Sequence, residues 1–351
     1  MRRLLNPLFV TSEDAYLTLD GENIVVRREK EEAGRFPLHN LEEIVSFSYA
    51  GASPALMGAC TKRNIGLSFC TPSGRFLART AGVETGNVLL RREQYRVADD
   101  AELSCAAART MIFGKLYNSR WSLERARRDH GLRINDERLK SASAQLKNLL
   151  PQVASAAHLD QLRGLEGVGA AAYFDVLDEM ILNNKNEFFF HGRSRRPPLD
   201  AFNAMLSFAY SLLANDCASA LESVGLDAYV GFLHRDRPGR TSLALDLMED
   251  LRPCMADRFV LTLVNNRVLV PDDFETRERG CFHDRQRTQN FSERLAGKEK
   301  GNADASIPGR EAAMGNGSLH TSFAVGAIST RRLGWVSTVF MEVMGDACFN
   351  H

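Results

Sequence analysis

The chain has 351 residues, and its 44 Lys and Arg balance its 44 Asp and Glu, so the formal net charge is zero. Hydrophobic residues make up 44% and charged residues 25%, which is typical of a globular protein long enough for two domains that need neither disulfides nor a metal to fold. No run approaches 18 apolar residues, which argues against a transmembrane helix, and the neutral total argues against a broad basic face for nucleic acid.

The cysteines and the N-terminal residues indicate a cytoplasmic protein. Seven cysteines lie far apart, with no CxxC spacing, which is typical of reduced thiols and offers no zinc site. No sustained apolar segment follows Arg2 and Arg3, so we expect no signal peptide.

Residues 1–97 are expected to form a small β-rich domain. Two β-prone runs, at 16–19 and 24–26, flank Asp20-Gly21-Glu22-Asn23, which is a hairpin signal. Pro54 fits the first turn of a short helix. The remaining elements expected in this region are strands over 44–47, 65–69 and 75–79 and that helix over 54–63.

Residues 98–276 are expected to form a helical domain, which begins with a segment at 101–129 that is rich in Ala, Leu and Arg and shows helical periodicity. Asp200 fits an N-cap, and Pro197-Pro198 separates it from the preceding helix. Helices are expected over 101–129, 136–149, 153–182, 199–224 and 242–264. The sequence therefore predicts an α+β protein, with a small N-terminal β domain followed by a larger all-α C-terminal domain.

The last segment, residues 277–351, differs from both. Glycines become frequent, together with Ser, Thr and Asn, and no helical pattern persists through residues 297–322. This composition predicts a weakly ordered tail.

Acidic residues and one histidine come close together near residue 240. In a helix, Asp246, Glu249 and Asp250 share one face, where like charges repel unless a divalent cation offsets them. His234 lies 12 residues earlier and could fold back beside that face, as imidazole and carboxylates suit a transition metal. A solvated acidic stripe and a structural histidine are the alternatives, and both stay open.

Glu166 stands among Gly164, Gly167 and Gly169, and each helical glycine costs roughly 1 kcal/mol relative to alanine. Such a cost needs a reason. Either another helix approaches closely at the glycines, or a substrate backbone approaches Glu166, and the sequence does not decide between the two.

Arginines form short clusters despite the neutral total, and arginine forks suit bidentate phosphate contacts. Any one cluster can equally be a solvated face. The clusters at 193–196 and 235–240 carry more weight, because the second adjoins His234 and the first lies in a loop. The full set of clusters is Arg91, Arg92 and Arg96; Arg125, Arg127 and Arg128; Arg193, Arg195 and Arg196; Arg235, Arg237 and Arg240.

Taken in order, these signals resemble a known family. Leu-Arg-Gly-Leu-Glu-Gly at 162–167, Gly-Phe-Leu-His at 231–234 and Leu-Asp-Leu-Met-Glu-Asp-Leu-Arg-Pro at 245–253 are similar to the CRISPR-associated adaptation integrases, the first-numbered Cas proteins. The opening at 6–10 and 14–17 resembles the type I-C branch. Further similar runs lie at 86–95, 115–120 and 196–208, and the resemblance covers about 4–276.

The resemblance implies a metal-dependent DNA endonuclease and integrase, which inserts prespacer DNA into a repeat array by attack of a 3′-hydroxyl on a phosphodiester. Glu166, His234 and Glu249 would be the catalytic ligands of Mg²⁺ or Mn²⁺, and Asp246 an accessory catalytic acid on the same helical face. His234 would have to bind as neutral imidazole, so activity should fall in acid. The DNA-binding arginines would be Arg91, Arg92, Arg193, Arg195, Arg196, Arg235, Arg237 and Arg240.

The resemblance also implies partners: double-stranded and branched DNA, namely the prespacer and the CRISPR repeat, a second copy of the chain in a homodimer, and a dimer of the small second-numbered Cas protein. No membrane is implied. A non-catalytic DNA-binding subunit of the adaptation complex is the main alternative, and a metal-dependent phosphohydrolase of small substrates is a second.

One departure from the family concerns the tail. The helical ending that the family carries, with its aromatic and proline-rich finish, is absent after the matching stretch at 272–277. An abrupt change of composition at that point suggests the hypothesis of a reading-frame shift. Translating the coding DNA in the other two frames beyond codon 277 tests it, since neither frame restoring an apolar helical pattern would refute it.

Overall fold

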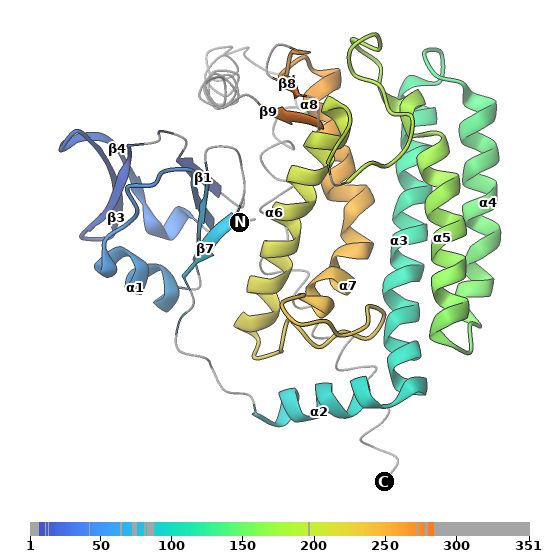
Figure 1. The fold of residues 1–351 in the computed structure, drawn as a ribbon, viewed down its shortest axis with the longest axis horizontal. Helices are drawn as coiled ribbons and strands as arrows, with labels where there is room; N and C mark the ends of the chain where they lie inside the picture. The colour runs from blue at the N-terminus through green and yellow to red at the C-terminus, as the bar shows by residue number, and fades with distance from the viewer. Residues whose placement is uncertain are drawn as a thin grey trace, which may run out of the picture.

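The structure, a computed structural model, describes residues 7–283 apart from 11, 13, 42, 64, 72–75, 81, 83–87, 196, 272–273 and 278–279. A β part and a helical part follow one another along the chain, as the sequence predicts (Figure 1). A hairpin of β8 (Phe274–Arg277) and β9 (Gly280–His283) follows the last described helix, so the end of the segment predicted as all-α, up to residue 276, forms a strand, and β9 lies in the predicted tail. The predicted weak order of the remaining tail falls outside the described residues.

The β part contains two small sheets around one core. The first sheet has the order β1-β5-β6-β7 and the second β2-β3-β4. Leu17, Ile24, Ile44, Leu56 and Leu67 are fully buried between these sheets and helix α1. The bounds are β1 (Pro7–Val10), β2 (Tyr16–Asp20), β3 (Asn23–Arg28), β4 (Glu31–Pro37), η1 (Leu38–Asn40), β5 (Glu43–Ser46), α1 (Pro54–Lys62), β6 (Gly66–Cys70) and β7 (Phe76–Arg79).

Local signals account for most of these elements. The predicted hairpin is confirmed, because Asp20 pairs with Asn23 and the turn between them uses the positive φ of Gly21, +57°. Ser53 caps α1 by accepting a hydrogen bond from the Leu56 amide at 3.3 Å, with Pro54 in the first turn. Strands β1 and β4 were not among the predicted elements. Strand β4 has an exposed, mostly polar sequence without strict alternation, so periodicity gives no signal there.

The helical part forms a bundle in which the longest helix, α3, packs against α4, α5 and α7 (Figure 1). Asp100, Asn135 and Asp200 cap α3, α4 and α6 through their side chains, so the predicted cap at Asp200 is confirmed. The bounds are α2 (Val88–Asp99), α3 (Ala101–His130), α4 (Asp136–Ala154), α5 (Leu159–Asp175), η2 (Leu177–Met180), α6 (Ala201–Ser223), α7 (Ser242–Leu251), η3 (Arg252–Asp257) and α8 (Arg258–Asn265).

Two helices expected to be continuous are interrupted. The predicted helix over 153–182 is divided, because α4 ends at Ala154 and the Gln161 side chain caps the start of α5 by accepting from the Ala157 amide at 3.1 Å. The predicted helix over 242–264 contains a π-helical turn, η3. Pro253 has no N–H to offer the carbonyl four residues earlier, which favours the wider turn at this point.

The predicted boundary at residue 97 falls inside a helix. Residues 88–97 were expected in the β-rich domain, but α2 spans Val88–Asp99 and buries Val97 in the helical core. The buried Gln94 donates to the carbonyls of Asp227 at 2.7 Å and Val230 at 2.9 Å, which ties α2 to the helical part. The boundary was misplaced because this amphipathic helix has only 12 residues and its arginines were interpreted as a charged surface cluster.

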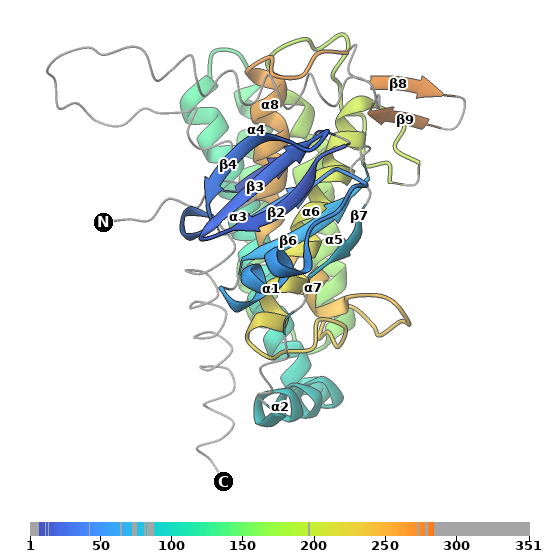
Figure 2. The ribbon, with the colours of Figure 1, turned by 90° about the vertical axis from the view of Figure 1, so that its left-hand side faces the viewer.

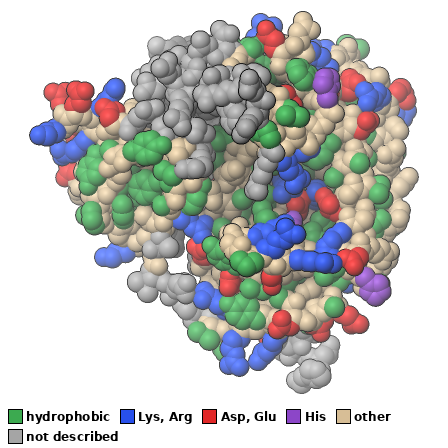
Figure 3. All heavy atoms as spheres, in the orientation of Figure 1, with side chains coloured by type: hydrophobic (Ala, Val, Ile, Leu, Met, Phe, Trp, Pro, Cys, Tyr) green, Lys and Arg blue, Asp and Glu red, His purple; other side chains and the backbone are tan. Residues whose placement is uncertain are grey.

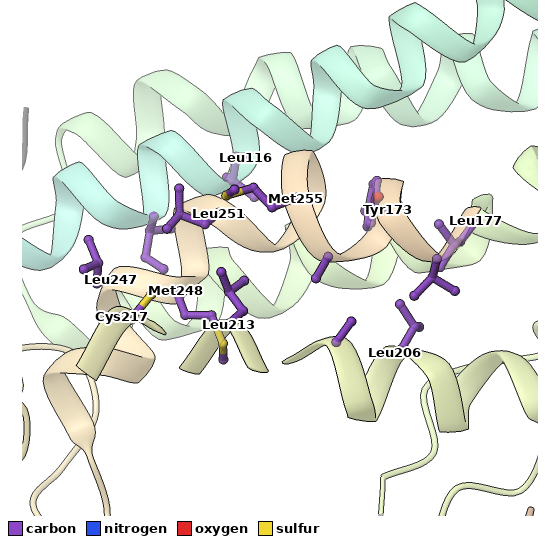
Figure 4. Close-up of a cluster of buried hydrophobic side chains, with 14 of the residues drawn as sticks. Leu116, Tyr173, Leu177, Leu206, Leu213, Cys217, Leu247, Met248, Leu251 and Met255 are labelled. Carbon is purple, nitrogen blue, oxygen red and sulfur yellow. The ribbon is translucent and has the colours of Figure 1, made fainter. Parts of the chain in front are cut away.

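The centre of the bundle is the run from α7 through η3 to α8, lying between α3 and α6. Figure 4 shows Leu251 and Met255 of this run beside Leu116 of α3, with Leu213 and Cys217 of α6 on the opposite side. Among the residues described, no helix has the length and hydropathy to cross a bilayer. Four described cysteines are buried free thiols: Cys60, Cys70, Cys105 and Cys217.

The β part packs on α6 through its four-stranded sheet (Figures 1 and 2). Val45, Phe47 and Cys70 form a small apolar cluster with Leu212 of α6. Beside it, Arg79 of β7 donates to the carbonyl of Asn215 at 3.2 Å and to the Ser219 hydroxyl at 3.1 Å. The contact therefore combines apolar burial with polar anchors along one face of α6.

A pair of carboxyl groups lies within this contact. Glu43 of β5 and Asp216 of α6 share a hydrogen bond, and burial raises the pKa of Glu43. Burial together with the Glu43 charge raises the pKa of Asp216 well above its usual value, against the opposing effect of Arg79. The pair is therefore stable only while it holds a proton.

We expect the free energy of unfolding of the Asp216→Asn variant to fall less than that of the wild-type protein as the pH rises above the ordinary carboxyl values near about 4. Folding raises both pKa values, so their contribution is complete below the unfolded values near pH 4 and is lost as the pH rises through the folded values. The side-chain amide that this substitution introduces would keep a donor for Glu43 without titrating, removing about 1.4 kcal/mol of pH dependence for each pKa unit. Urea unfolding across the pH range measures this. Exposed Asp99→Asn is the control, and equal slopes for both variants would contradict the expectation.

Candidate active site

Two carboxylates from distant parts of the chain meet at one ammonium group. Lys115 of α3 donates from Nζ to Oε1 of Glu166 on α5 and, at 2.7 Å, to Oε2 of Glu249 on α7. Lys115 is only 7% exposed and Glu249 only 4% exposed, whereas Glu166 is partly exposed. Two of the predicted metal ligands, Glu166 and Glu249, are thus brought together around a single positive charge.

Glu249 is ionised despite its burial. Its second oxygen, Oε1, pairs with Nη1 of Arg252 at 2.9 Å. Burial alone would raise the pKa of Glu249, but the charges of Arg252 and Lys115 outweigh it, and His234 adds to them, so the pKa lies below the usual value.

Gly169 allows α5 to approach α3 closely enough for this pairing. A Cβ on Gly169 would lie 2.3 Å from Cδ2 of Leu116, the residue after Lys115. By contrast, no atom of a neighbouring element in the described part of the chain lies within 4 Å of a Cβ placed at Gly164 or Gly167. Of the two explanations for these glycines, close approach of a helix or of a substrate backbone, close helix packing holds at Gly169. Gly164 and Gly167 face open space.

We expect Gly169→Ala to destabilise the protein by about 1–3 kcal/mol relative to Gly167→Ala, because its methyl group has no room against the fully buried Leu116. Both variants gain about 1 kcal/mol of helix propensity, so the difference between them isolates the crowding. Thermal or urea unfolding of the two variants measures this difference. Equal stabilities would show that α3 and α5 can separate without cost.

The third predicted ligand, His234, lies on the connection between α6 and α7, residues 224–241. Asp246 of α7, fully buried, accepts from the amides of Phe232 at 2.7 Å, Leu233 at 2.9 Å and His234 at 3.0 Å, and its Oδ1 also contacts Nδ1 of the His234 ring. The carboxylate therefore fixes both the backbone and the imidazole of this connection.

Two further features hold the connection in place. A Cβ on Gly231 would lie 2.8 Å from Oδ2 of Asp246, so only glycine lets the backbone come this close to the carboxylate. Arg163, one turn before Glu166 on α5, donates from Nε at 3.1 Å and from Nη2 at 2.6 Å to the carbonyl of Leu233. Helix α5 thus supplies Glu166 and also Arg163, which holds Leu233, the residue before His234.

Asp246 was predicted as an accessory acid on the face of Glu249. The structure places it on that helix, but both of its oxygens are engaged by the 232–234 segment. With Asp246 accepting from Nδ1, the proton of a neutral imidazole lies on Nδ1, and the Nε2 lone pair is left available to a ligand. This is the arrangement of a carboxylate that orients a metal-binding histidine.

The donor set can be compared with the needs of a divalent cation. Within the described residues, no group of three or more His, Cys, Asp or Glu side chains is close enough to hold a metal ion. The Glu166 and Glu249 carboxylates nevertheless already converge on one cation, the Lys115 ammonium, and Asp246 anchors the His234 ring to α7, the helix that carries Glu249. Oxygen and imidazole donors of this kind fit Mg²⁺ or Mn²⁺ in type.

The predicted DNA-binding arginines differ in availability. Arg92, Arg195, Arg235 and Arg237 are exposed, and Arg240 is half-buried. Figure 3 shows basic side chains gathered over the α6–α7 connection, with acidic and histidine side chains beside them. This connection carries His234, so exposed positive charge lies next to the candidate site.

Two other predicted arginines are used inside the fold. Arg91 donates from Nε to the Gly225 carbonyl at 3.2 Å. Arg193 donates to Asn203 at 2.8 Å and to Ser207 at 3.1 Å, and its guanidinium lies 5.2 Å from the centre of the Tyr210 ring. Through these contacts Arg193 packs against α6. Arg196 lies outside the described residues.

Sequence reasoning missed Lys115, Arg163 and Arg252 as parts of the site. One signal was available for Lys115. It stands on the apolar face of α3, in register with the buried Ile112, Ser119 and Leu123, and a lysine on a core face needs an acidic partner. Arg163 and Arg252 stand three residues from Glu166 and Glu249, a spacing that places them on the same helical side but does not reveal their partners.

Comparisons with known proteins identify the family of the chain. The family described as CRISPR associated protein Cas1 matches residues 8–296. A CRISPR-associated endonuclease Cas1 of Rhodospirillum rubrum is 48% identical over 285 residues, covering 80% of this chain and 82% of the relative. Another, of Chlorobaculum tepidum, is 45% identical over 281 residues, covering 80% of this chain and 82% of the relative.

Among solved structures, a casposase bound to its integration product has a TM-score of 0.69. It is 22% identical, and the match covers 97% of this chain and 91% of that chain. At this identity the likeness concerns the fold. The family match continues past the predicted end of the resemblance near 276, so part of the segment assigned to the tail belongs to the family region.

Proposed function

The chain belongs to the Cas1 family of CRISPR-associated proteins, and from this membership we propose that it is a metal-dependent DNA endonuclease and integrase of CRISPR adaptation. In this role it inserts prespacer DNA into the repeat array. The observation that carries the proposal is the convergence of Glu166 and Glu249 on one cation position, together with a histidine that Asp246 orients from the same helix as Glu249.

Glu166, Glu249 and Nε2 of His234 are the proposed ligands. A bound Mg²⁺ or Mn²⁺ would stabilise the negative charge that develops on the attacking and leaving oxygens of the phosphodiester. Asp246 orients the imidazole through Nδ1, and Arg163 holds the Leu233 carbonyl next to it. The rigid backbone of the 232–234 segment therefore lowers the cost of placing the donor nitrogen.

The exposed Arg235 and Arg237 are proposed to hold the phosphodiester backbone close to His234, together with Arg92 and Arg195. Contacts of this kind recognise phosphates independently of base sequence and weaken as salt rises. We further propose double-stranded and branched DNA, a second copy of this chain and the small second-numbered Cas protein as partners. The neutral chain would then hold DNA at a few defined tracks and not on one basic face.

A strand-transfer assay tests the proposal. The protein is incubated with the small partner, Mn²⁺, a labelled prespacer duplex with free 3′-hydroxyls and a repeat-containing target. The expected product is the labelled strand joined covalently to the target, lost with a chelator and reduced as salt rises. Binding to branched DNA without any joined product would instead identify a non-catalytic assembly subunit.

A further inference from the structure

Lys115 has an unusual position for a lysine. Its side chain leaves the apolar face of α3, where the neighbouring Ile112 and Leu116 are fully buried, and it is itself only 7% exposed. Burial of an ammonium group requires paired acidic partners. Its partners are the Glu166 and Glu249 carboxylates, which come from two different helices.

Among the side chains that pair directly at this point, the charges balance without any added ion. The carboxylates of Glu166 and Glu249 face two cations, the Lys115 ammonium and the Arg252 guanidinium. A divalent cation bound by the same carboxylates would leave an excess of positive charge in a largely buried place. One of the two resident cations therefore has to withdraw when such an ion binds.

The two resident cations differ in how firmly they are held. Arg252 pairs with Oε1 of Glu249 at 2.9 Å and lies 5.1 Å from the centre of the Tyr210 ring, which adds a cation–π contact. The Lys115 ammonium is held by the two carboxylate oxygens that face each other, at the end of a flexible four-carbon stem. Lys115 is the cation that can leave.

We propose that the Lys115 ammonium is an internal counter-cation, which holds the Glu166 and Glu249 carboxylates together in the metal-free protein and withdraws from them when a divalent cation binds. The inference rests on the proposed metal-dependent function. It assigns Lys115 two opposing effects: the metal-free site is stabilised against carboxylate repulsion, and the affinity for the metal is lowered, because each binding event must displace the ammonium.

Mn²⁺ binding to the full-length protein tests this inference without any DNA. Isothermal titration calorimetry is carried out on the wild-type protein and on Lys115→Met, Lys115→Gln and Lys115→Arg. Lys115→Met should bind Mn²⁺ at least about tenfold more tightly than the wild-type protein. Lys115→Arg keeps the charge and should stay close to the wild-type affinity. Exposed Lys140→Met on α4 is the matched control and should not change it.

Thermal unfolding gives a second measurement. Lys115→Met should melt at a lower temperature than the wild-type protein without metal, and Mn²⁺ should raise its Tm by more. Should Lys115→Met not fold, Lys115→Gln keeps a neutral donor for one carboxylate and carries the same expectation.

The outcomes separate the inference from the function on which it rests. Unchanged or weaker Mn²⁺ binding by Lys115→Met and Lys115→Gln, with normal binding by the wild-type protein, would overturn the role of Lys115 and leave metal dependence standing. No Mn²⁺ binding by any variant would overturn both. Tighter binding by Lys115→Arg as well would show that charge at this position does not control the affinity.

Discussion

Replacing His234 by Ala should reduce Mn²⁺-dependent strand transfer by at least about 100-fold while leaving the protein folded. The imidazole supplies the proposed nitrogen donor, and no neighbouring side chain of the 232–234 segment, Phe232 or Leu233, can replace it. The loss of stability should be small, because the three backbone amides that anchor the connection to Asp246 do not depend on the imidazole.

The measurement compares initial rates of strand transfer and the unfolding midpoint for each variant. His39→Ala is the matched control, since this exposed histidine lies in the β part, far from α7 along the chain. Glu166→Ala should lose activity to a similar extent. Activity within about threefold of wild type in either site variant would remove that residue from the proposed ligand set, and an unfolded His234→Ala would mean that the ring contact to Asp246 is needed for folding.

The parts of the fold that the sequence predicts are those with local causes. The β2–β3 hairpin depends on the Gly21 turn, and the start of α6 depends on the Asp200 cap, so neighbouring residues suffice for both. The interruption of the predicted helix at 242–264 was missed because Pro253 can kink, end or widen a helix, and the choice depends on packing around it.

The residues of the candidate site likewise fall into two groups, those indicated by local sequence motifs and those that only the packed structure brings to the site. Glu166, His234 and Glu249 stand out through their short motifs, and the structure brings the two glutamates to one point. Lys115 bridges the two glutamates, but it lies 51 residues before Glu166 and 134 residues before Glu249 in the chain. No rule of sequence spacing connects it with them. The same holds for Gly169, whose fit against Leu116 appears only once α3 and α5 are packed.

Asp246 is expected to matter for folding as well as for activity, and this distinguishes it from a metal ligand. Asp246→Ala would leave the amides of Phe232, Leu233 and His234 without their acceptor in a buried place. Each unsatisfied buried donor costs about 1–3 kcal/mol, although relaxation and entering water reduce the sum. We expect a loss of about 3–5 kcal/mol in the free energy of unfolding, measured with urea.

Asp246→Asn separates the two roles more sharply. Either orientation of the amide places an NH₂ group against an N–H donor of the 232–234 segment, so a loss of stability is still expected. If the NH₂ group faces His234, it donates to Nδ1, the ring proton moves to Nε2 and the proposed donor nitrogen is lost. Strand transfer should therefore fall by about 10–100-fold at a temperature where the variant is fully folded.

The exposed Asp236, on the same connection, provides the matched Asp→Asn control and should retain wild-type stability and activity. If Asp246→Asn lost stability but kept its strand-transfer rate below its unfolding temperature, Asp246 would serve only to anchor the backbone. If it lost activity with unchanged stability, the amide contacts would contribute little and a direct role for the carboxylate would be favoured. Loss of both is the result that a carboxylate orienting His234 from the core of the bundle requires.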